Sequence, residues 1–380
     1  MRLKCPYRDR RSRSRKLERA IKNLLVTAAA LLLSLAAAEL VLQTLVKPSR
    51  LYSTLRSVPA ANQWKNEVRF WERHQARKDS LVGGHDPLLG WEQNANRERL
   101  RGSQRSAKEP ESTRIVAIGD SFTYGNEVAD NENFAALLDA DPGLQVFNMG
   151  VPGFGIGQAY LKYRHFGARR NPDVVLFGIY VDDYERTSMQ FTSAAKPGFA
   201  VIDDQLAVLG QPVPTPDTEL ARIARSLDER TLIIDAVKNL WLKATTGAAA
   251  ERAFFANTDR VVGKILSALS DSLSERQQLL IVHIPRAESF TDDADPFRLA
   301  MGERLLAIYA RLGLRHVDLG AGFRNTASDR EVFADYYVHR PGGSVGHLSP
   351  QGHRAAAALI RAALATADQP ARSRSLSNIR

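Results

Sequence analysis

The chain has 380 residues, of which 44% are hydrophobic, and a formal net charge of +10. This length is enough for a full catalytic domain and additional segments. Residues 1–22 contain ten Lys or Arg and only two acidic residues, so most of the positive charge lies in this segment and the rest of the chain is nearly neutral. Because no basic stripe that could follow phosphates remains, the composition argues against a nucleic-acid-binding protein.

An apolar segment at residues 23–46 follows this basic tail and contains no Lys or Arg. Its length fits a transmembrane helix, for which about 20 residues suffice, and Glu39 lies toward its outer end, where a charge can reach the interface. The basic flank predicts that residues 1–22 are cytoplasmic and that one helix anchors a periplasmic body in the inner membrane. A cleaved signal peptide and a buried helix are the alternatives. The only cysteine, Cys5, precedes the segment, so the exported part contains no disulfide.

Residues 47–112 are polar and contain three scattered tryptophans. We expect a stalk that becomes ordered near Trp91 and then a linker, because Arg, Glu, Ser and Asn dominate residues 94–113. The tryptophans are expected to pack on the domain or at the membrane interface rather than to bind a ligand.

Residues 113–366 alternate between strand and helix patterns. Apolar runs of strand length occur at 115–118, 146–148, 174–180, 279–284 and 316–319. Helical patterns occur at 133–140, 157–169, 220–243, 259–273, 296–312 and 350–365. Continuous apolar strands separated by amphipathic helices predict an α/β fold in three layers, with a parallel five-stranded sheet covered on both faces.

Residues 185–257 interrupt this alternation and are expected to form an insertion or lid. Within it, two short apolar runs flank Asp203-Asp204, which predicts a β-hairpin. The C-terminal residues 367–380 are polar and are expected to be disordered.

A serine at a strand end gives the first catalytic candidate. The apolar run 115–118 ends in Gly119-Asp120-Ser121, at the sheet edge where α/β proteins place their ligands. His347 lies in a loop just before the last helical pattern. A serine is inert until a base removes its proton, so the pair predicts nucleophilic acyl transfer with His347 as the base. A helix N-cap is the alternative role for Ser121, and we expect His353 to be structural.

Two other strands end in polar or glycine-rich segments. The segment 146–155 is a strand followed by a Gly/Pro-rich turn, in which Gly153 can bring a backbone N–H close to a bound group. The third strand ends in Asp182-Asp183.

These segments resemble the sequence blocks of the SGNH (GDSL-type) hydrolase family, in its membrane-anchored bacterial subset. The resemblance implies that Ser121 is the nucleophile, that Gly153 is the oxyanion glycine with Asn148 supporting its turn, and that His347 is the base. It also implies a flavodoxin-like strand order.

The chain departs from the family pattern at two positions. The family's oxyanion-donating Asn is replaced by Asp182, and an ionised carboxylate only accepts hydrogen bonds. Asp182 must therefore be protonated by burial, or another donor replaces it, or the site is weakened. The family has an Asp two or three residues before its histidine, and this chain has Ser344 and Val345 at those positions. Either Asp335 supplies the acid, if the loop folds back, or the site works as a Ser–His dyad without an acid.

The resemblance implies a periplasmic serine esterase or O-acyltransferase that acts on acyl esters, O-acetyl esters above all, of carbohydrates or lipids. The alternative, supported by Asp182 and Ser344, is a catalytically impaired domain that binds a glycan or protein partner at the cell envelope. We expect no cofactor and no metal, because the sequence has no dinucleotide fingerprint, no phosphate loop and no histidine spacing typical of a metal site.

Overall fold

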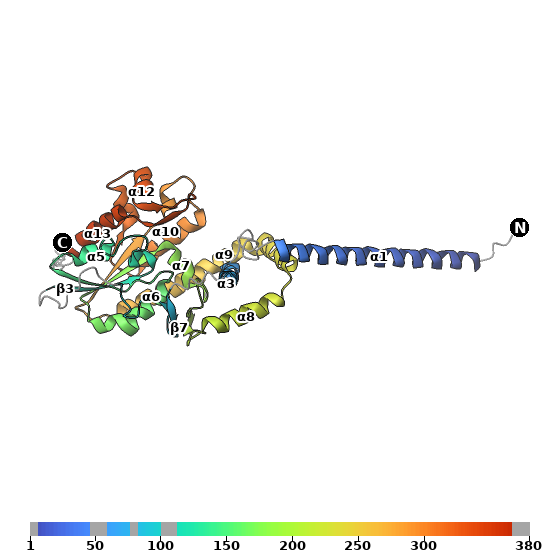
Figure 1. Cartoon of the computed structure of the whole chain (residues 1–380), viewed down its shortest axis with the longest axis horizontal. Helices are drawn as coiled ribbons and strands as arrows, with labels where there is room; N and C mark the ends of the chain where they lie inside the picture. The colour runs from blue at the N-terminus through green and yellow to red at the C-terminus, as the bar shows by residue number, and fades with distance from the viewer. Residues whose placement is uncertain (1–6, 46–58, 77–82, 100–111, 367–380) are drawn as a thin grey trace, which may run out of the picture.

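The computed structural model describes residues 7–45, 59–76, 83–99 and 112–366. At its centre lies a five-stranded parallel sheet in the order β4-β3-β5-β8-β9 (Figure 1). These strands are β3 (Thr113–Gly119), β4 (Leu144–Asn148), β5 (Val174–Tyr180), β8 (Gln278–Ile284) and β9 (His316–Asp318). The order of the second, first, third, fourth and fifth strands along the chain is the flavodoxin-like order, so the predicted fold is confirmed.

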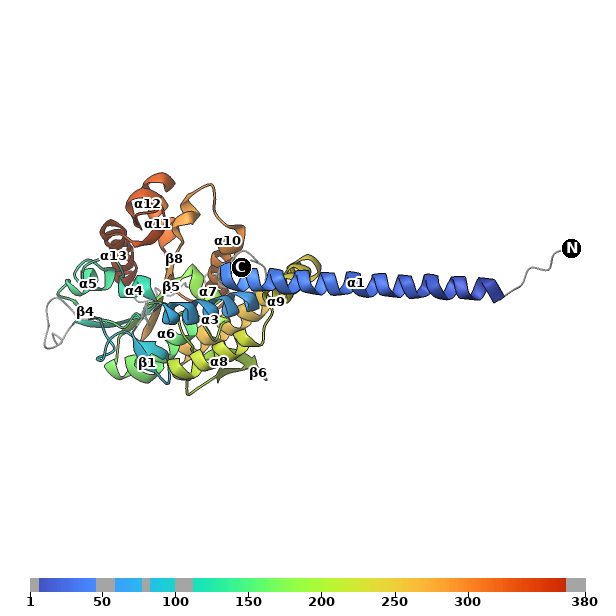
Figure 2. The same cartoon turned by 45° about the vertical axis from the view of Figure 1, so that its right-hand side comes forward.

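Helices cover both faces of the sheet, which explains why its strands are apolar throughout. In β3, Ile115 and Ala117 face one core and Val116 and Ile118 face the other. The first core is closed by α5 (Phe134–Asp139), α11 (Leu319–Arg324) and α13 (Pro350–Ala365), and the second by α6 (Ile156–Lys162), α9 (Leu232–Asp271) and α10 (Pro296–Arg311). Figures 1 and 2 show α5 and α13 on one side of the sheet and α6 on the other.

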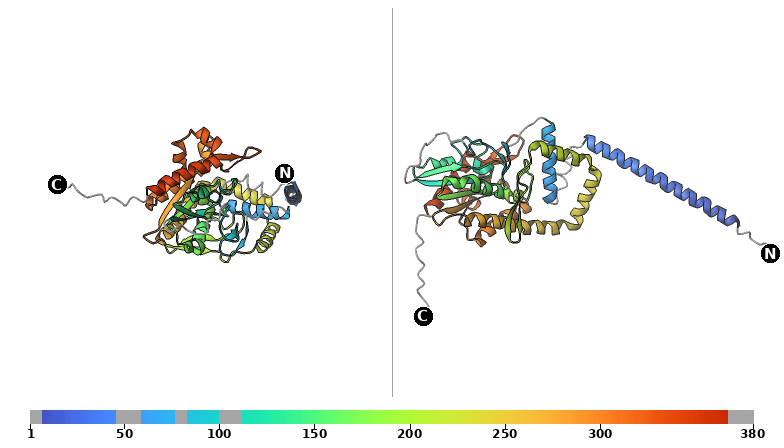
Figure 3. Two further views of the ribbon diagram at one scale, coloured as in Figure 1. Left: turned by 60° about the vertical axis from the view of Figure 1, so that its left-hand side comes forward. Right: turned by 90° about the horizontal axis from the view of Figure 1, so that it is seen from below.

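The N-terminal helix α1 (Tyr7–Leu45) projects away from this domain (Figures 1 and 3). Its segment Glu18–Gln43 is long and apolar enough to cross a membrane and is not buried by the rest of the protein. At the domain end, the Glu39 carboxylate accepts hydrogen bonds from the backbone N–H groups of Leu232 at 2.7 Å and Ile233 at 2.9 Å. These N–H groups start α9 and have no acceptor within their own helix, so Glu39 joins α1 to α9.

In the described part of the predicted stalk 47–112, the chain is ordered near Trp91, as predicted, and residues 59–75 also form a helix packed on the domain, which was not predicted. Helix α3 (Pro59–Gln75) buries Val68 and Phe70, and a hairpin of β1 (Gly84–Asp86) and β2 (Gly90–Glu92) buries Trp91. The Trp91 indole N–H donates to the carbonyl of Pro152 at 2.9 Å. These segments are polar on average, yet their few large apolar side chains all face the domain. Residues 46–58, 77–82 and 100–111 of the stalk and the C-terminal tail 367–380 lie outside the described residues.

The insertion contains the predicted hairpin, formed by β6 (Gly198–Ile202) and β7 (Gln205–Leu209). Asp203 and Asp204 at its tip have φ values of 48° and 58°, as the favoured two-residue hairpin turn requires. The helices differ from the prediction: α8 (Pro216–Asp228) ends early, and α9 is one 40-residue helix that runs through Gly247. The alanines at 248–250 are strong helix formers and offset that glycine.

The remaining short elements lie near the carboxyl edge of the sheet or on the domain surface. They are α4 (Ser121–Tyr124), α7 (Val181–Thr187), α12 (Asp329–Asp335), β10 (Tyr337–His339), β11 (Val345–Leu348), the π-helix Tyr163–Gly167, and the 3-10 turns Ala168–Arg170 and Ala287–Phe290.

Trp91→Ala tests whether residues 84–92 belong to the domain. We expect it to cost about 3–5 kcal/mol of stability, which lowers Tm by roughly 10 °C, because Trp91 is only 1% exposed. Thermal unfolding of the full-length protein in detergent measures this. Trp241→Ala is the control, because Trp241 is 62% exposed, and it should shift Tm by less than about 2 °C. Equal shifts for the two variants would contradict the packing of this segment on the domain.

Candidate active site

Ser121 begins α4 directly after the end of β3. The Asp120 carboxylate accepts the N–H of Phe122 at 2.8 Å, so Asp120 is the N-cap and the capping role considered for Ser121 is wrong. Gly119 has φ 150°, and a Cβ there would lie 2.3 Å from the Thr123 hydroxyl. Only glycine fits this turn, which presents the Ser121 hydroxyl at the carboxyl edge of the sheet.

His347 lies on β11, which pairs with β10 in an antiparallel hairpin. Its Nε2 is 2.8 Å from Ser121 Oγ, although the two residues are 226 positions apart. The Phe122 ring packs against the imidazole with centroids 4.8 Å apart. The structure thus brings the predicted serine and histidine together within hydrogen-bonding distance.

Glu127 is the acid that the sequence analysis missed. Its Oε2 lies 2.6 Å from His347 Nδ1 and accepts the backbone N–H of His347 at 2.9 Å. Gly346 permits this approach, because a Cβ there would lie 2.5 Å from Glu127 Oε2. The two options left open by Ser344 and Val345 are therefore wrong: the site has a carboxylate, and it is not that of Asp335.

The position of Glu127 explains why it was missed. It follows Ser121 by six residues in the chain, in the loop after α4, whereas the family pattern has its acid two or three residues before the histidine. The available signal was an acidic residue in a loop at the same sheet edge as the serine. Glu127 has φ 69°, which is uncommon for a residue with a side chain.

Two arginines hold Glu127 and its loop. The Arg340 guanidinium donates to both carboxylate oxygens, at 2.6 and 2.7 Å. Arg99 donates to the carbonyls of Tyr124 and Gly125 and, at 2.9 Å, to that of Val128. Residues 94–99, expected to belong to a linker, therefore shape the loop that carries the acid.

The hydrogen bond from Arg340, together with His347, outweighs partial burial and lowers the pKa of Glu127 to about 2. The carboxylate is therefore ionised at neutral pH and accepts the proton on His347 Nδ1, which leaves Nε2 free to accept the Ser121 proton. Because the pKa is lowered, the interaction stabilises the fold fully above pH 4.5, the ordinary glutamate value, and is lost as the pH falls toward 2.

Gly153 lies in the turn after β4 with φ 80°. Its N–H donates to no acceptor among the described residues, so it is available to a bound group. Asn148 stabilises this region: its amide donates to the carbonyl of Thr123 at 2.9 Å, and its oxygen accepts the N–H of Gly150 at 3.1 Å. This ties the glycine turn to α4.

Asp182 does not have the properties of an oxyanion donor. Its oxygens bind Arg286 at 2.5 Å and Arg298 at 3.2 Å. Burial alone would raise its pKa, but Arg298 and Arg286 outweigh burial and the pKa is lowered. The expectation that burial protonates Asp182 is wrong, and an ionised carboxylate cannot donate a hydrogen bond.

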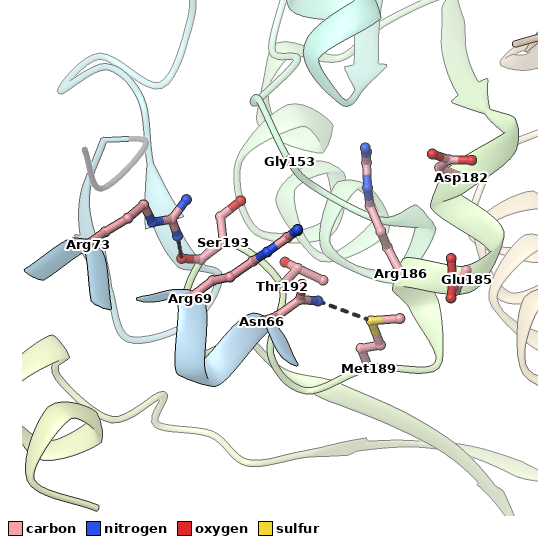
Figure 4. A pocket seen from close by; sticks show the side chains of 10 residues that line it. All are labelled: Asn66, Arg69, Arg73, Gly153, Asp182, Glu185, Arg186, Met189, Thr192 and Ser193. Carbon is pink, nitrogen blue, oxygen red and sulfur yellow. Dashed lines mark hydrogen bonds between the residues drawn. The ribbon is translucent and has the colours of Figure 1, made fainter. Parts of the chain in front are cut away.

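A polar cavity of about 290 Å³ lies beside Gly153 and is lined in part by Asp182 (Figure 4). The second histidine, His353, is buried outside it, and its Nδ1 accepts the N–H of Phe134 at 3.2 Å. Burial lowers the pKa of His353 to about 3, so it is a neutral structural group. The described residues contain no group of three or more His, Cys, Asp or Glu that could hold a metal ion.

Asp182→Asn tests the assignment of Asp182 as a partner of arginines. We expect it to lower stability by about 2 kcal/mol, because the amide leaves Arg286 and Arg298 without their shared negative charge. Glu288→Gln is the control, since the Glu288 side chain is more exposed and its carboxylate pairs with Arg286 alone among the described residues, at 3.2 Å. Thermal unfolding compares the two. If Asp182→Asn were neutral, or stabilised the protein, this assignment would fail.

No family model and no curated protein matches the chain. It is similar to the solved structure of a lipase/acylhydrolase from Enterococcus faecalis (14% identity, 68% of this chain, 98% of that chain, TM-score 0.40). It is also similar to an acetylxylan esterase from Geobacillus stearothermophilus, solved as a catalytic mutant (14% identity, 68% of this chain, 96% of that chain, TM-score 0.39). A third similar structure is a lipolytic G-D-S-L family protein from Veillonella parvula (12% identity, 66% of this chain, 97% of that chain, TM-score 0.35). The solved structures that this chain resembles thus include G-D-S-L lipolytic proteins and acetylxylan esterases.

Proposed function

We propose that this chain is a serine ester hydrolase or acyltransferase of the SGNH type. The observation that carries the proposal is the continuous contact from Ser121 Oγ to His347 Nε2 at 2.8 Å and from His347 Nδ1 to Glu127 at 2.6 Å. A nucleophile, a base and a group that orients the base are the three components that serine acyl transfer requires.

The geometry supports the following mechanism. Ser121 Oγ attacks the carbonyl carbon of the ester while His347 Nε2 takes its proton, and His347 then returns that proton to the departing alcohol. Glu127 stays ionised and stabilises the imidazolium. The acyl group left on Ser121 is removed when water, or the hydroxyl of an acceptor sugar, attacks with His347 again acting as base.

Backbone groups supply the oxyanion donors in this proposal. Ser121 and Gly153 lie in the segments that follow two neighbouring strands, β3 and β4. Because Asp182 cannot donate a hydrogen bond, the backbone N–H groups of Ser121 and Gly153 are the oxyanion donors in this proposal. One such donor is worth about 100- to 1,000-fold in rate, so we expect a slower enzyme than one with a third, side-chain donor.

The binding-module alternative loses one of its two supports. It rested on Asp182 and on the missing acid near Ser344. Glu127 supplies that acid, and the Arg340 pair keeps it ionised. We therefore favour catalysis on acyl esters of carbohydrates or lipids, O-acetyl esters above all.

We also propose that α1 anchors the enzyme in the inner membrane and that the catalytic domain faces the periplasm. The apolar segment Glu18–Gln43 and the basic residues before it support this topology.

The first test is chemical. Ser121→Ala and His347→Ala should each abolish labelling by a fluorophosphonate probe, and the double variant should be no worse than either, since the two residues act as one unit. Glu127→Ala should slow labelling by about 100- to 10,000-fold, as expected for loss of the orienting acid. His353→Ala is the control: it should lower Tm and retain measurable labelling. Unchanged labelling in the Ser121 and His347 variants would favour the binding module.

The second test concerns topology. An alkaline phosphatase fused after residue 110 should be active, because that enzyme matures only outside the cytoplasm, and a cytoplasmic reporter at the same position should be inactive. The opposite pattern would rule out a periplasmic catalytic domain.

A further inference from the structure

The cavity beside Gly153 has one wall made by helix α3. Asn66, Arg69 and Arg73 point from α3 toward the cavity, and Gly153 and Ser193 lie across from them (Figure 4). We call the cavity lined by Arg69, Arg73, Gly153 and Ser193 the arginine pocket. Its volume of about 290 Å³ is at the lower end of the range for small-molecule sites, enough for one sugar unit. Because the candidate oxyanion glycine is part of its lining, a group bound here would lie next to the reacting ester.

The acidic residues of the pocket are already paired with arginines. Asp182 binds Arg286 and Arg298, and Glu185 binds Arg298 at 2.6 Å. A third lining arginine, Arg186, is likewise committed, to Asp120 at 2.9 Å and to Asp183 at 2.7 Å. The pocket's carboxylates therefore do not neutralise the two arginines of α3.

Arg69 and Arg73 have no carboxylate partner within the described ranges 7–45, 59–76, 83–99 and 112–366. Among the described residues, Arg73 donates to the carbonyl of Ser193 alone, at 3.3 Å. The two arginines are four positions apart on one helix, an arrangement of like charges that destabilises a helix. Both side chains are exposed at the mouth of the pocket; partial desolvation and the positive charge of Arg69 lower the pKa of Arg73, as expected for two like charges that repel each other.

We propose that the arginine pocket binds an oxyanion, a carboxylate or a phosphate, carried by the carbohydrate part of the ester substrate. Guanidinium groups recognise such groups with paired, charge-assisted hydrogen bonds. This inference rests on the proposed function for the position of the ester, but binding of the anion itself needs no catalysis. It makes the enzyme selective for acylated acidic glycans over neutral ones.

Equilibrium binding separates this inference from the proposed catalysis. The full-length protein in detergent is titrated with three unacylated ligands: an oligogalacturonate, an oligo(glycerol phosphate) and a neutral xylo-oligosaccharide. We expect at least one anionic ligand to bind about tenfold or more tightly than the neutral one, with affinity that falls as salt rises. The anionic ligand that binds better identifies the source of the charge as carboxylate or phosphate.

Arg69→Gln and Arg73→Gln should each weaken binding of that anion about tenfold, and the double variant should remove the preference over the neutral ligand. Arg330→Gln is the matched control, because Arg330 is an exposed helical arginine outside the pocket. Thermal unfolding checks that each variant is folded. Equal affinity for all three ligands, or anion binding unaffected in the double variant, would overturn the inference.

A kinetic measurement then connects the pocket to the reaction. For acetylated oligogalacturonate compared with acetylated xylo-oligosaccharide, the ratio of kcat/KM values should fall about tenfold or more in Arg69→Gln. If the fluorophosphonate test fails but anion binding depends on both arginines, the catalytic proposal is wrong and the binding site stands. If labelling succeeds but the kinetic ratio does not depend on the arginines, the pocket is not the substrate site.

Discussion

The active site depends on one carboxylate. Glu127 contacts the imidazole and the backbone of His347 and is held by the forked guanidinium of Arg340. It comes from the loop after the serine helix, whereas its partners come from the β10–β11 hairpin more than 200 residues later. A single ionised group thus joins the two halves of the site and fixes the side of the imidazole that faces Ser121. Among the described residues, Glu127 forms the only ion pairs between this hairpin and the serine loop.

Around that carboxylate, the carboxyl edge of the sheet is organised by pairs of arginine and aspartate. Arg186 links Asp120, the residue before the serine, to Asp183 on α7, and Arg298 links Asp182 to Glu185. The arginines lower the pKa of Asp182 against the effect of burial, whereas burial and the neighbouring Asp120 raise the pKa of Asp183 despite its contact with Arg186. These ion pairs differ from Arg69 and Arg73 on α3, which have no carboxylate partner among the residues that the structure describes.

The sequence predicted those features of the fold that a short stretch of residues determines by itself. Apolar runs marked the five strands, Asp203-Asp204 marked the hairpin, and Gly119 marked the turn that presents Ser121. It did not predict Glu127, because the loop carrying that residue takes its shape from distant groups, Arg99 and Arg340. The packing of Trp91 on the domain was predicted, but its partner, the carbonyl of Pro152, lies 61 residues away and could not be read from the local sequence. The sequence analysis also did not predict that α9 continues through Gly247, whose cost the helix-forming alanines at 248–250 offset.

The contact of Glu39 with the start of α9 has a mechanical consequence. A catalytic domain that is tethered to its membrane anchor only by a flexible linker takes many positions and orientations relative to the membrane. Here the Glu39 carboxylate of α1 accepts hydrogen bonds from the first turn of α9, a helix that continues into the domain core. This contact restricts rotation of the domain relative to α1. Under the proposed topology, the catalytic edge would stand at a set height and orientation above the bilayer. Geometry would then select among acyl esters by their distance from the membrane, before any pocket residue touches them.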